Sequence, residues 1–354
     1  MKRMFSVLGA LLLLTACAPA ESAAPAATPT VEPTTAPTAV PEMTPTPAPS
    51  PVATPDPLME ISTWSGAMPG QALQYTIEQG EAELDPDVTW PEEGVTLHIM
   101  GWKGSMEEAA ETYGVPLETL QALNPDPRIE QDAEGNPYYS ELILEQNYQL
   151  PDNPVKRVTV EVPWIENRYE RSGTYAVPAS LSDQAAACMA TAYYFQYEHF
   201  GMHLGIEPSE PLPDNDSYFY YSTDGAMYTS YSDLEQFLHC VYTPDYCARI
   251  LGGPLDQRAE DAIQPYYQGE DDTICFQMGD RGSNIAYCGK VYTEPELQPD
   301  GSLTFWQLSL TIESEDFQGW GQDKEYIPDT ATILPVRLEP SETGWRVDEL
   351  SLPN

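Results

Sequence analysis

The pattern of apolar and polar residues along residues 95–151 predicts the order strand, helix, helix, strand. Residues 95–99 alternate as a short strand, and residues 142–150 return as a second one. Between them, Ser105 followed by acidic residues predicts the start of one helix. A second helix over 117–123 carries a leucine at every third position, so one of its faces is apolar. The segment is therefore expected to form a small unit with its own apolar core.

The pattern changes in residues 155–354, where helices are predicted first and strands afterwards. A helix from 183 to 200 has a broad apolar face that includes Cys188, and Ser180 or Ser182 is expected to cap it. Two more helices are expected to begin at Ser232 and at Thr243. Strands are predicted at 156–162, 273–278, 285–291, 302–313, 332–339 and 345–350. This order is typical of an α+β domain whose helices pack on one face of a curved antiparallel sheet.

The residues before these segments predict export and a tether. Lys2 and Arg3 precede an apolar run that is too short to span a membrane, as in an export signal. Residues 17–57 are rich in Pro, Thr and Ala, which favours an extended spacer without a core. We expect residues 58–94 to be irregular apart from one weak strand over 73–77.

The residues at the end of the apolar run, Leu14-Thr15-Ala16-Cys17, resemble the lipobox of bacterial lipoproteins. The resemblance implies a signal peptide over 1–16 and a lipid on Cys17. It also implies a chain that is anchored at the outer face of the cytoplasmic membrane and faces the cell wall.

The charge of the chain limits its partners. The sequence has 15 basic and 56 acidic residues, which gives a net charge of −41. Such a surface repels nucleic acids and anionic lipid headgroups, whereas it tolerates neutral glycans, basic partners and cations. We therefore predict no nucleic-acid binding, and a membrane contact made through the lipid alone.

The chain has six cysteines, and assigning Cys17 to lipid leaves five, with no CxxC spacing typical of metal or redox sites. If residues 273–291 form a symmetric hairpin, Cys275 lies opposite Cys288 at a separation that suits a disulfide. We predict that bridge. Cys240 and Cys247, on either side of a predicted helix start, form a second candidate pair.

No constellation of residues indicates catalysis. His199 and His203 are four residues apart, but Gly201 interrupts the helix between them and no HExxH motif surrounds them. His239 and Cys240 are adjacent, so in a helix their side chains point apart. We predict no enzyme activity, no metal site and no cofactor.

Residues 95–151 resemble a LysM module, the small βααβ fold that binds N-acetylglucosamine glycans such as peptidoglycan. The resemblance rests on Tyr113-Gly114-Val115, on Leu123-Asn124-Pro125 and on the closing Gln146-x-Tyr148-x-Leu150-Pro151. The segment departs from the family at Lys103, at Ala109 and in an insertion over 128–141. The resemblance implies a glycan groove at Gly104, Ser105, Met106, Asn124, Pro125 and Asp126.

Parts of residues 155–354 are similar to the IseA family, cystatin-like proteins of Gram-positive cell walls that inhibit NlpC/P60-type endopeptidases. The similarity rests on an aromatic helix start, on Tyr242-Thr243-Pro244-Asp245 and on Gly279-Asp280-Arg281-Gly282-Ser283. It implies a cystatin- or NTF2-like domain and a contact with the partner through Asp280, Arg281, Ser283 and Asn284, or through the acidic run 270–272.

The predicted function is that of a cell-envelope lipoprotein that binds peptidoglycan and binds or inhibits a wall protein such as a murein endopeptidase. The alternative is a small-molecule-binding or sensory lipoprotein in which the LysM-like module is a spacer that binds no glycan.

Overall fold

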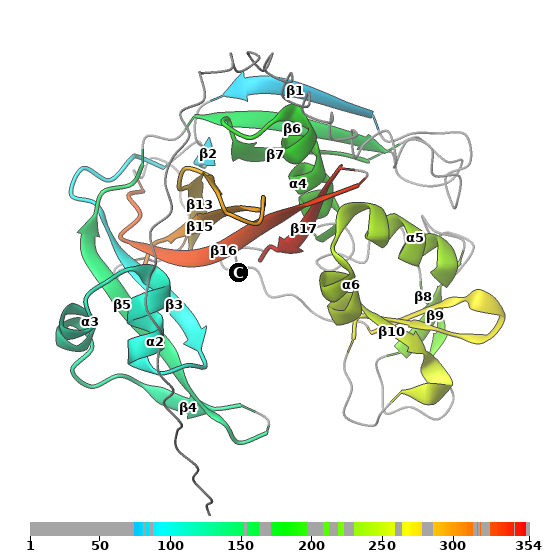
Figure 1. The fold of residues 1–354 in the computed structure, drawn as a ribbon, viewed down its shortest axis with the longest axis horizontal. Coiled ribbons are helices and arrows are strands. Elements are labelled where there is room, and N and C mark those ends of the chain that lie inside the picture. Colours follow the sequence, from blue (N-terminus) through cyan, green and yellow to red (C-terminus); the bar gives the residue numbers. More distant parts are fainter. Residues whose placement is uncertain are drawn as a thin grey trace, which may run out of the picture. The chain divides into compact units, whose positions relative to one another are not determined.

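The computed structural model describes a mixed α+β fold, which confirms the α+β part of the predicted fold class (Figure 1). Residues 52–354 form one compact unit. The lipobox, the spacer, His199, His203 and residues 279–284 lie outside the described residues. The structure describes residues 74–80, 83–84, 88–132, 134–151, 154–162, 171–196, 208–211, 219–222, 230–258, 264–277, 286–313, 317, 319, 326–342 and 344–351.

The described strands form three sheets. A three-stranded sheet has the order β1 (Gln74–Gly80), β6 (Val155–Val162), β7 (Arg171–Pro178). A five-stranded sheet has the order β10 (Leu251–Pro254), β11 (Tyr266–Gln268), β12 (Ile274–Gln277), β9 (Phe219–Ser222), β8 (Pro208–Pro211). The largest sheet has the order β2 (Glu83–Leu84), β13 (Tyr287–Tyr292), β15 (Leu303–Thr311), β16 (Thr330–Ser341), β3 (Val95–Trp102), β5 (Pro137–Tyr148), β4 (Ile129–Gln131), with β14 (Glu296–Leu297) on β15 and β17 (Gly344–Glu349) on β16.

The helices fall where sequence signals begin and end them. Ser105 caps α2, whereas Gly114 ends it in the left-handed conformation at φ 67°, which favours glycine. Ser182 caps α4 and Thr243 caps α6, both as predicted, but α5 is capped by Ser230 and not by Ser232. The described helices are α2 (Met106–Tyr113), α3 (Leu117–Leu123), α4 (Asp183–Phe195), α5 (Tyr231–Val241) and α6 (Pro244–Ile250), with 3₁₀ turns at Leu255–Gln257 and Glu270–Asp272.

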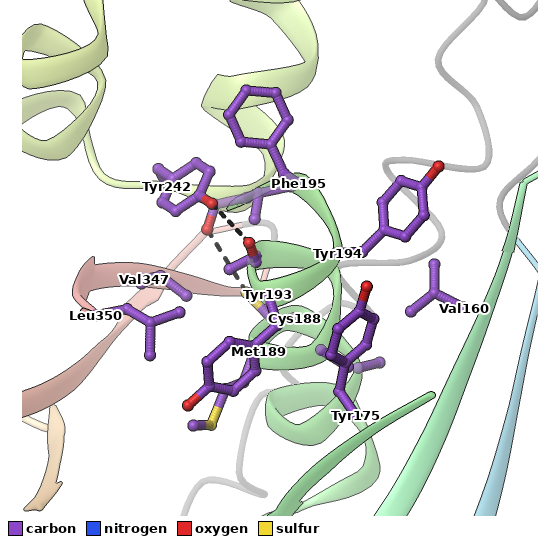
Figure 2. Close-up of a cluster of buried hydrophobic side chains, with 14 of the residues drawn as sticks. Val160, Tyr175, Cys188, Met189, Tyr193, Tyr194, Phe195, Tyr242, Val347 and Leu350 are labelled. Carbon is purple, nitrogen blue, oxygen red and sulfur yellow. Dashed lines mark hydrogen bonds between the residues drawn. The ribbon is translucent and has the colours of Figure 1, made fainter. Parts of the chain in front are cut away.

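Helix α4 lies between two sheets and is buried on all sides. Every residue from 185 to 195 is buried, whereas the sequence pattern had predicted one apolar face. The helix contacts β6 and β7 of the three-stranded sheet and β17 of the largest sheet. In Figure 2, Val160 and Tyr175 lie on one side of α4, and Val347 and Leu350 lie on the other. The expectation of helices on one face of a single sheet was therefore too simple.

The predicted order of strand, helix, helix and strand is present in residues 95–151, as β3, α2, α3 and β5. The insertion adds a short strand, β4, which pairs with β5. The unit does not form a sheet of its own, because β3 pairs in parallel with β16 from Thr96–Thr330 to His98–Thr332. Its strands thus belong to the same sheet as strands of residues 155–354.

Residues before 95 also take part in the three-stranded sheet and in the largest sheet. The predicted weak strand is β1, and all of its residues pair with β6. Strand β2 pairs with β13, and Val88 bridges to Tyr326. The segment 58–94 was expected to be irregular, yet its described parts complete sheets built from residues 155–354. None of the described helices is long and apolar enough to cross a membrane.

The predicted hairpin between Cys275 and Cys288 does not form, so the disulfide prediction is wrong. Strand β12, with Cys275, pairs with β9 and β11, whereas β13, with Cys288, pairs with β2 and β15 in another sheet. Both residues are buried thiols, as are Cys188, Cys240 and Cys247. Burial raises the pKa of Cys188 and of Cys247 to about 12, and that of Cys275 to about 11.

We expect residues 18–354 to react slowly with a thiol-specific chromogenic reagent at about pH 8, because little of the reactive thiolate is present in the native state. In urea, all five thiols should react at once. A count that is two thiols lower in urea without reductant would show that a disulfide forms after all.

Candidate functional site

The predicted groove residues lie in two loops, one before α2 and one after α3. Both loops lie beside β5, the first next to Tyr139 and the second between Ile143 and Tyr139. Tyr139 on β5 is opposite Trp102, the last residue of β3, and is also opposite Ile129, the first residue of β4. Because adjacent strands are about 4.8 Å apart, the two loops leave the sheet roughly 10 Å from each other. The structure therefore brings the two predicted halves of the groove to one end of the βααβ unit (Figure 1).

The first loop is held by the cap of α2. Ser105 Oγ accepts a hydrogen bond from the Glu108 N–H at 3.1 Å, and the Ser105 N–H donates to Glu108 Oε2 at 2.7 Å. The Trp102 indole N–H donates to the Ser105 carbonyl at 2.9 Å. These bonds give partners to backbone groups that the start of a helix leaves without intrahelical hydrogen bonds, and they fix the loop relative to β3. Ser105 is exposed, while Gly104 and Met106 are partly buried.

The second loop is held by Asn124. Its side-chain Nδ2 donates to the carbonyl oxygens of Leu120 and Ile143, both at 2.8 Å, and its Oδ1 accepts from the Ile143 N–H at 2.8 Å. The side chain therefore joins the end of α3 to β5. Because Asn124 uses both ends of its amide in this way, its role is to position the loop. Pro125 and Asp126, the next two residues, are exposed.

Two aromatic side chains lie between the loops. Trp102 and Tyr139 are opposite each other on β3 and β5, and both pack against the core that lies under α2 and α3. The Trp102 ring meets the Tyr113 ring edge-on, with 5.9 Å between the ring centroids. Ile129, on the far side of Tyr139, is 58 % exposed. An apolar row therefore runs from the core to the surface between the two loops.

The insertion borders the first loop. Lys103 Nζ contacts Asp132 Oδ2 at 3.1 Å, which ties the loop before α2 to the hairpin of β4 and β5. The Asn136 N–H and the Lys103 ammonium, both of which stabilise the carboxylate, hold the pKa of Asp132 below its usual range. The insertion therefore forms one border of the candidate groove.

The acidic run at 270–272, the alternative partner contact, forms a 3₁₀ turn before β12. The Asp272 carboxylate accepts from Gln268 Nε2 at 2.8 Å and from the Ser232 N–H at 3.4 Å. The run thus stabilises its own turn and connects it to α5. The predicted partner residues Asp280, Arg281, Ser283 and Asn284 lie outside the described residues.

The structure also shows a group of polar side chains that the sequence did not indicate. His98 on β3, Glu141 on β5 and Glu313 after β15 bring one ligand atom each to within 4.8 Å of one another. His98 and Glu141 are 43 residues apart, and Glu313 is farther still, so no local motif marks the group. Its members meet because β16 connects β15 to β3.

No protein-family model matches the chain, and the comparison with curated proteins finds no match either.

Replacing Asn124 by Ala should lower the free energy of unfolding by about 1–3 kcal/mol, because the partly buried N–H of Ile143 and two carbonyl groups lose their partner. Urea unfolding of residues 18–354 measures the change. Gln121→Ala, an exposed substitution in α3, should stay within about 0.5 kcal/mol of the unchanged chain. Equal stability of the two variants would contradict the positioning role of Asn124.

Proposed function

We propose that this chain is a cell-envelope lipoprotein without enzymatic activity that binds N-acetylglucosamine glycan, such as peptidoglycan, through residues 95–151. One observation carries the proposal. The loops at 104–106 and 124–126 are both fixed by side-chain hydrogen bonds, and both lie beside β5: the first follows Trp102, which is opposite Tyr139, and Asn124 of the second bonds to Ile143. A site whose loops are already ordered spends little of its binding energy on ordering them.

The chemistry of the two loops suits a neutral sugar chain. Trp102 and Tyr139 combine an apolar ring with a polar tip, and such side chains are favoured where one end is packed and the other is wet. Asp126 and Ser105 are exposed and offer oxygen acceptors to hydroxyl and amide groups. A net charge of −41 does not repel an uncharged glycan. The similarity of the segment to LysM modules supports the same ligand class.

The predicted lipid on Cys17 would hold the glycan-binding unit near the cell wall. A spacer of about 40 residues at roughly 3.1 Å each reaches about 120 Å when it is extended. Tethering raises the effective concentration of the βααβ unit near the wall, so a weak affinity for single glycan chains suffices.

Replacing Asp126 by Ala should weaken binding of residues 18–354 to insoluble peptidoglycan about tenfold, because a hydrogen bond to a charged acceptor contributes about 1.5–3 kcal/mol. A pulldown over a range of peptidoglycan concentrations measures the apparent affinity. The matched control is Asp256→Ala, which removes the same charge from an exposed residue of another element.

Equal weakening by both variants would point to a nonspecific charge effect, and no binding by the unchanged, folded chain would remove the glycan proposal. In that case the alternative, a sensory or small-molecule-binding lipoprotein with a spacer in place of a glycan module, becomes the better reading.

The second part of the proposal is that residues 155–354 bind or inhibit a murein endopeptidase of the NlpC/P60 type. The Tyr-Thr-Pro-Asp junction supports it, because this junction forms an ordered corner. Thr243 Oγ1 caps α6 by accepting from the Tyr246 N–H at 3.3 Å, and donates to Asp348 Oδ1 at 2.7 Å. Asp280, the predicted partner contact, also belongs to residues 155–354.

We expect residues 18–354 to slow peptidoglycan digestion by such an endopeptidase, and the double variant Asp280→Ala, Ser283→Ala to relieve most of the inhibition. The experiment needs the chain from 18 onward, since β1, β2 and β3 complete sheets of residues 155–354. Release of soluble fragments measures the rate. An unchanged rate at large excess of the unchanged chain would remove this part of the proposal, whatever the glycan pulldown gives.

A further inference from the structure

We propose that His98, Glu141 and Glu313 bind one divalent transition-metal ion, of which Zn²⁺ is the best fit. One ring nitrogen of His98 and one carboxylate oxygen of each glutamate lie within 4.8 Å of one another. Imidazole nitrogen and carboxylate oxygen are both ordinary zinc ligands, at about 2.0–2.2 Å from the metal. Tetrahedral ligands at those distances are about 3.3 Å apart, so a carboxylate movement of roughly 1–1.5 Å completes the set.

The surroundings of the His98 ring favour a bound ion. Its residue is 7 % exposed, and both ring nitrogens are buried. Nδ1 contacts the Glu141 carboxylate, but neither ring nitrogen has a hydrogen-bond partner among the residues that the structure describes. A buried polar atom without a partner costs free energy, and such atoms in folded proteins usually bind a water molecule or an ion, or have a functional role. A metal ion supplies the missing partner for the ring.

The fold positions Glu313 from a distant part of the sequence. Asp329 holds it in place, because Asp329 Oδ1 accepts from the Glu313 N–H at 2.8 Å and the Asp329 carbonyl accepts from the Thr96 N–H at 2.8 Å. Glu313 is therefore fixed next to β3 although it follows β15. Its side chain is exposed and that of Glu141 is 42 % exposed, so an ion reaches the site from solvent.

The site lies on the face of β3 and β5 opposite Ile99 and Leu142. Ile99 and Leu142, which follow His98 and Glu141, are paired with each other and pack in the core under α2 and α3. Successive residues of a strand point to opposite faces, so His98 and Glu141 point away from that core. The ligands come from both sides of the β3–β16 pair. A bound ion would therefore clamp the βααβ unit to β15.

Metal-stripped residues 18–354 should bind one Zn²⁺ per chain by isothermal titration calorimetry at about 0.15 M ionic strength, which screens the acidic surface. Binding should raise the melting temperature by several degrees, since an ion that binds only the folded state stabilises it. Glu313→Gln should lower the affinity about tenfold or more and remove the shift in melting temperature. Glu313 is exposed, so this variant keeps the fold, which circular dichroism checks.

The matched control is Glu145→Gln, which removes one charge from an exposed residue of β5 outside the group and should bind Zn²⁺ as the unchanged chain does. His98→Gln should behave like Glu313→Gln. Absence of saturable one-to-one binding, or equal affinity of Glu313→Gln and Glu145→Gln, would overturn the proposal and leave His98 and Glu141 as a contact without a metal ion. Neither outcome bears on the glycan pulldown.

Discussion

The burial of α4 between two sheets is the constraint on which most of the described structure depends. Ala185, Ala186, Ala187, Ala190 and Ala192 are fully buried or nearly so, and small side chains let strands approach the helix from both sides. The large buried side chains Tyr193, Tyr194 and Phe195 lie at its C-terminal end. A fully buried large side chain contributes about 1.5–3 kcal/mol. The side chains of α4 lie at the centre of the core that the three-stranded sheet and the largest sheet share.

Polar contacts fix α4 where apolar packing alone allows it to slide. The buried Lys156 on β6 donates to Asp183 Oδ1 at 2.8 Å, at the start of the helix. The Tyr193 hydroxyl donates to Gln307 Oε1 and lies 3.1 Å from the Tyr292 hydroxyl, which connects the end of the helix to β13 and β15. Buried groups of this kind contribute most when all of their hydrogen bonds are made. They set the register between the helix and both sheets.

The parallel pairing of β3 with β16 joins the βααβ unit to the strands of residues 155–354. A module on a flexible linker would search for its ligand independently of the larger domain. Here the two share a sheet, so a glycan bound at the loops of 104–106 and 124–126 would orient the strands of residues 155–354 as well. The group of His98, Glu141 and Glu313 lies across the same junction. Binding to the wall and presentation to a wall protein would then be parts of one rigid geometry.

The sequence by itself determined the local structure of this protein. Ser105, Ser182 and Thr243 lie at the starts of helices, as the sequence allowed, because caps depend on neighbouring backbone groups. The order of strand, helix, helix and strand followed from apolar periodicity, which likewise depends on residues close together in the sequence. The two loops of the candidate groove came from the resemblance to LysM modules.

Only the tertiary structure decided which strands pair and which faces are covered. The hairpin expected around Cys275 and Cys288 was wrong because alternation within a strand does not specify its partner. The β3–β16 pair joins residues more than 200 positions apart, and no local signal encodes it. That pairing brings His98 close to Glu313. The group of His98, Glu141 and Glu313 can therefore be recognised in the folded structure but not in the sequence.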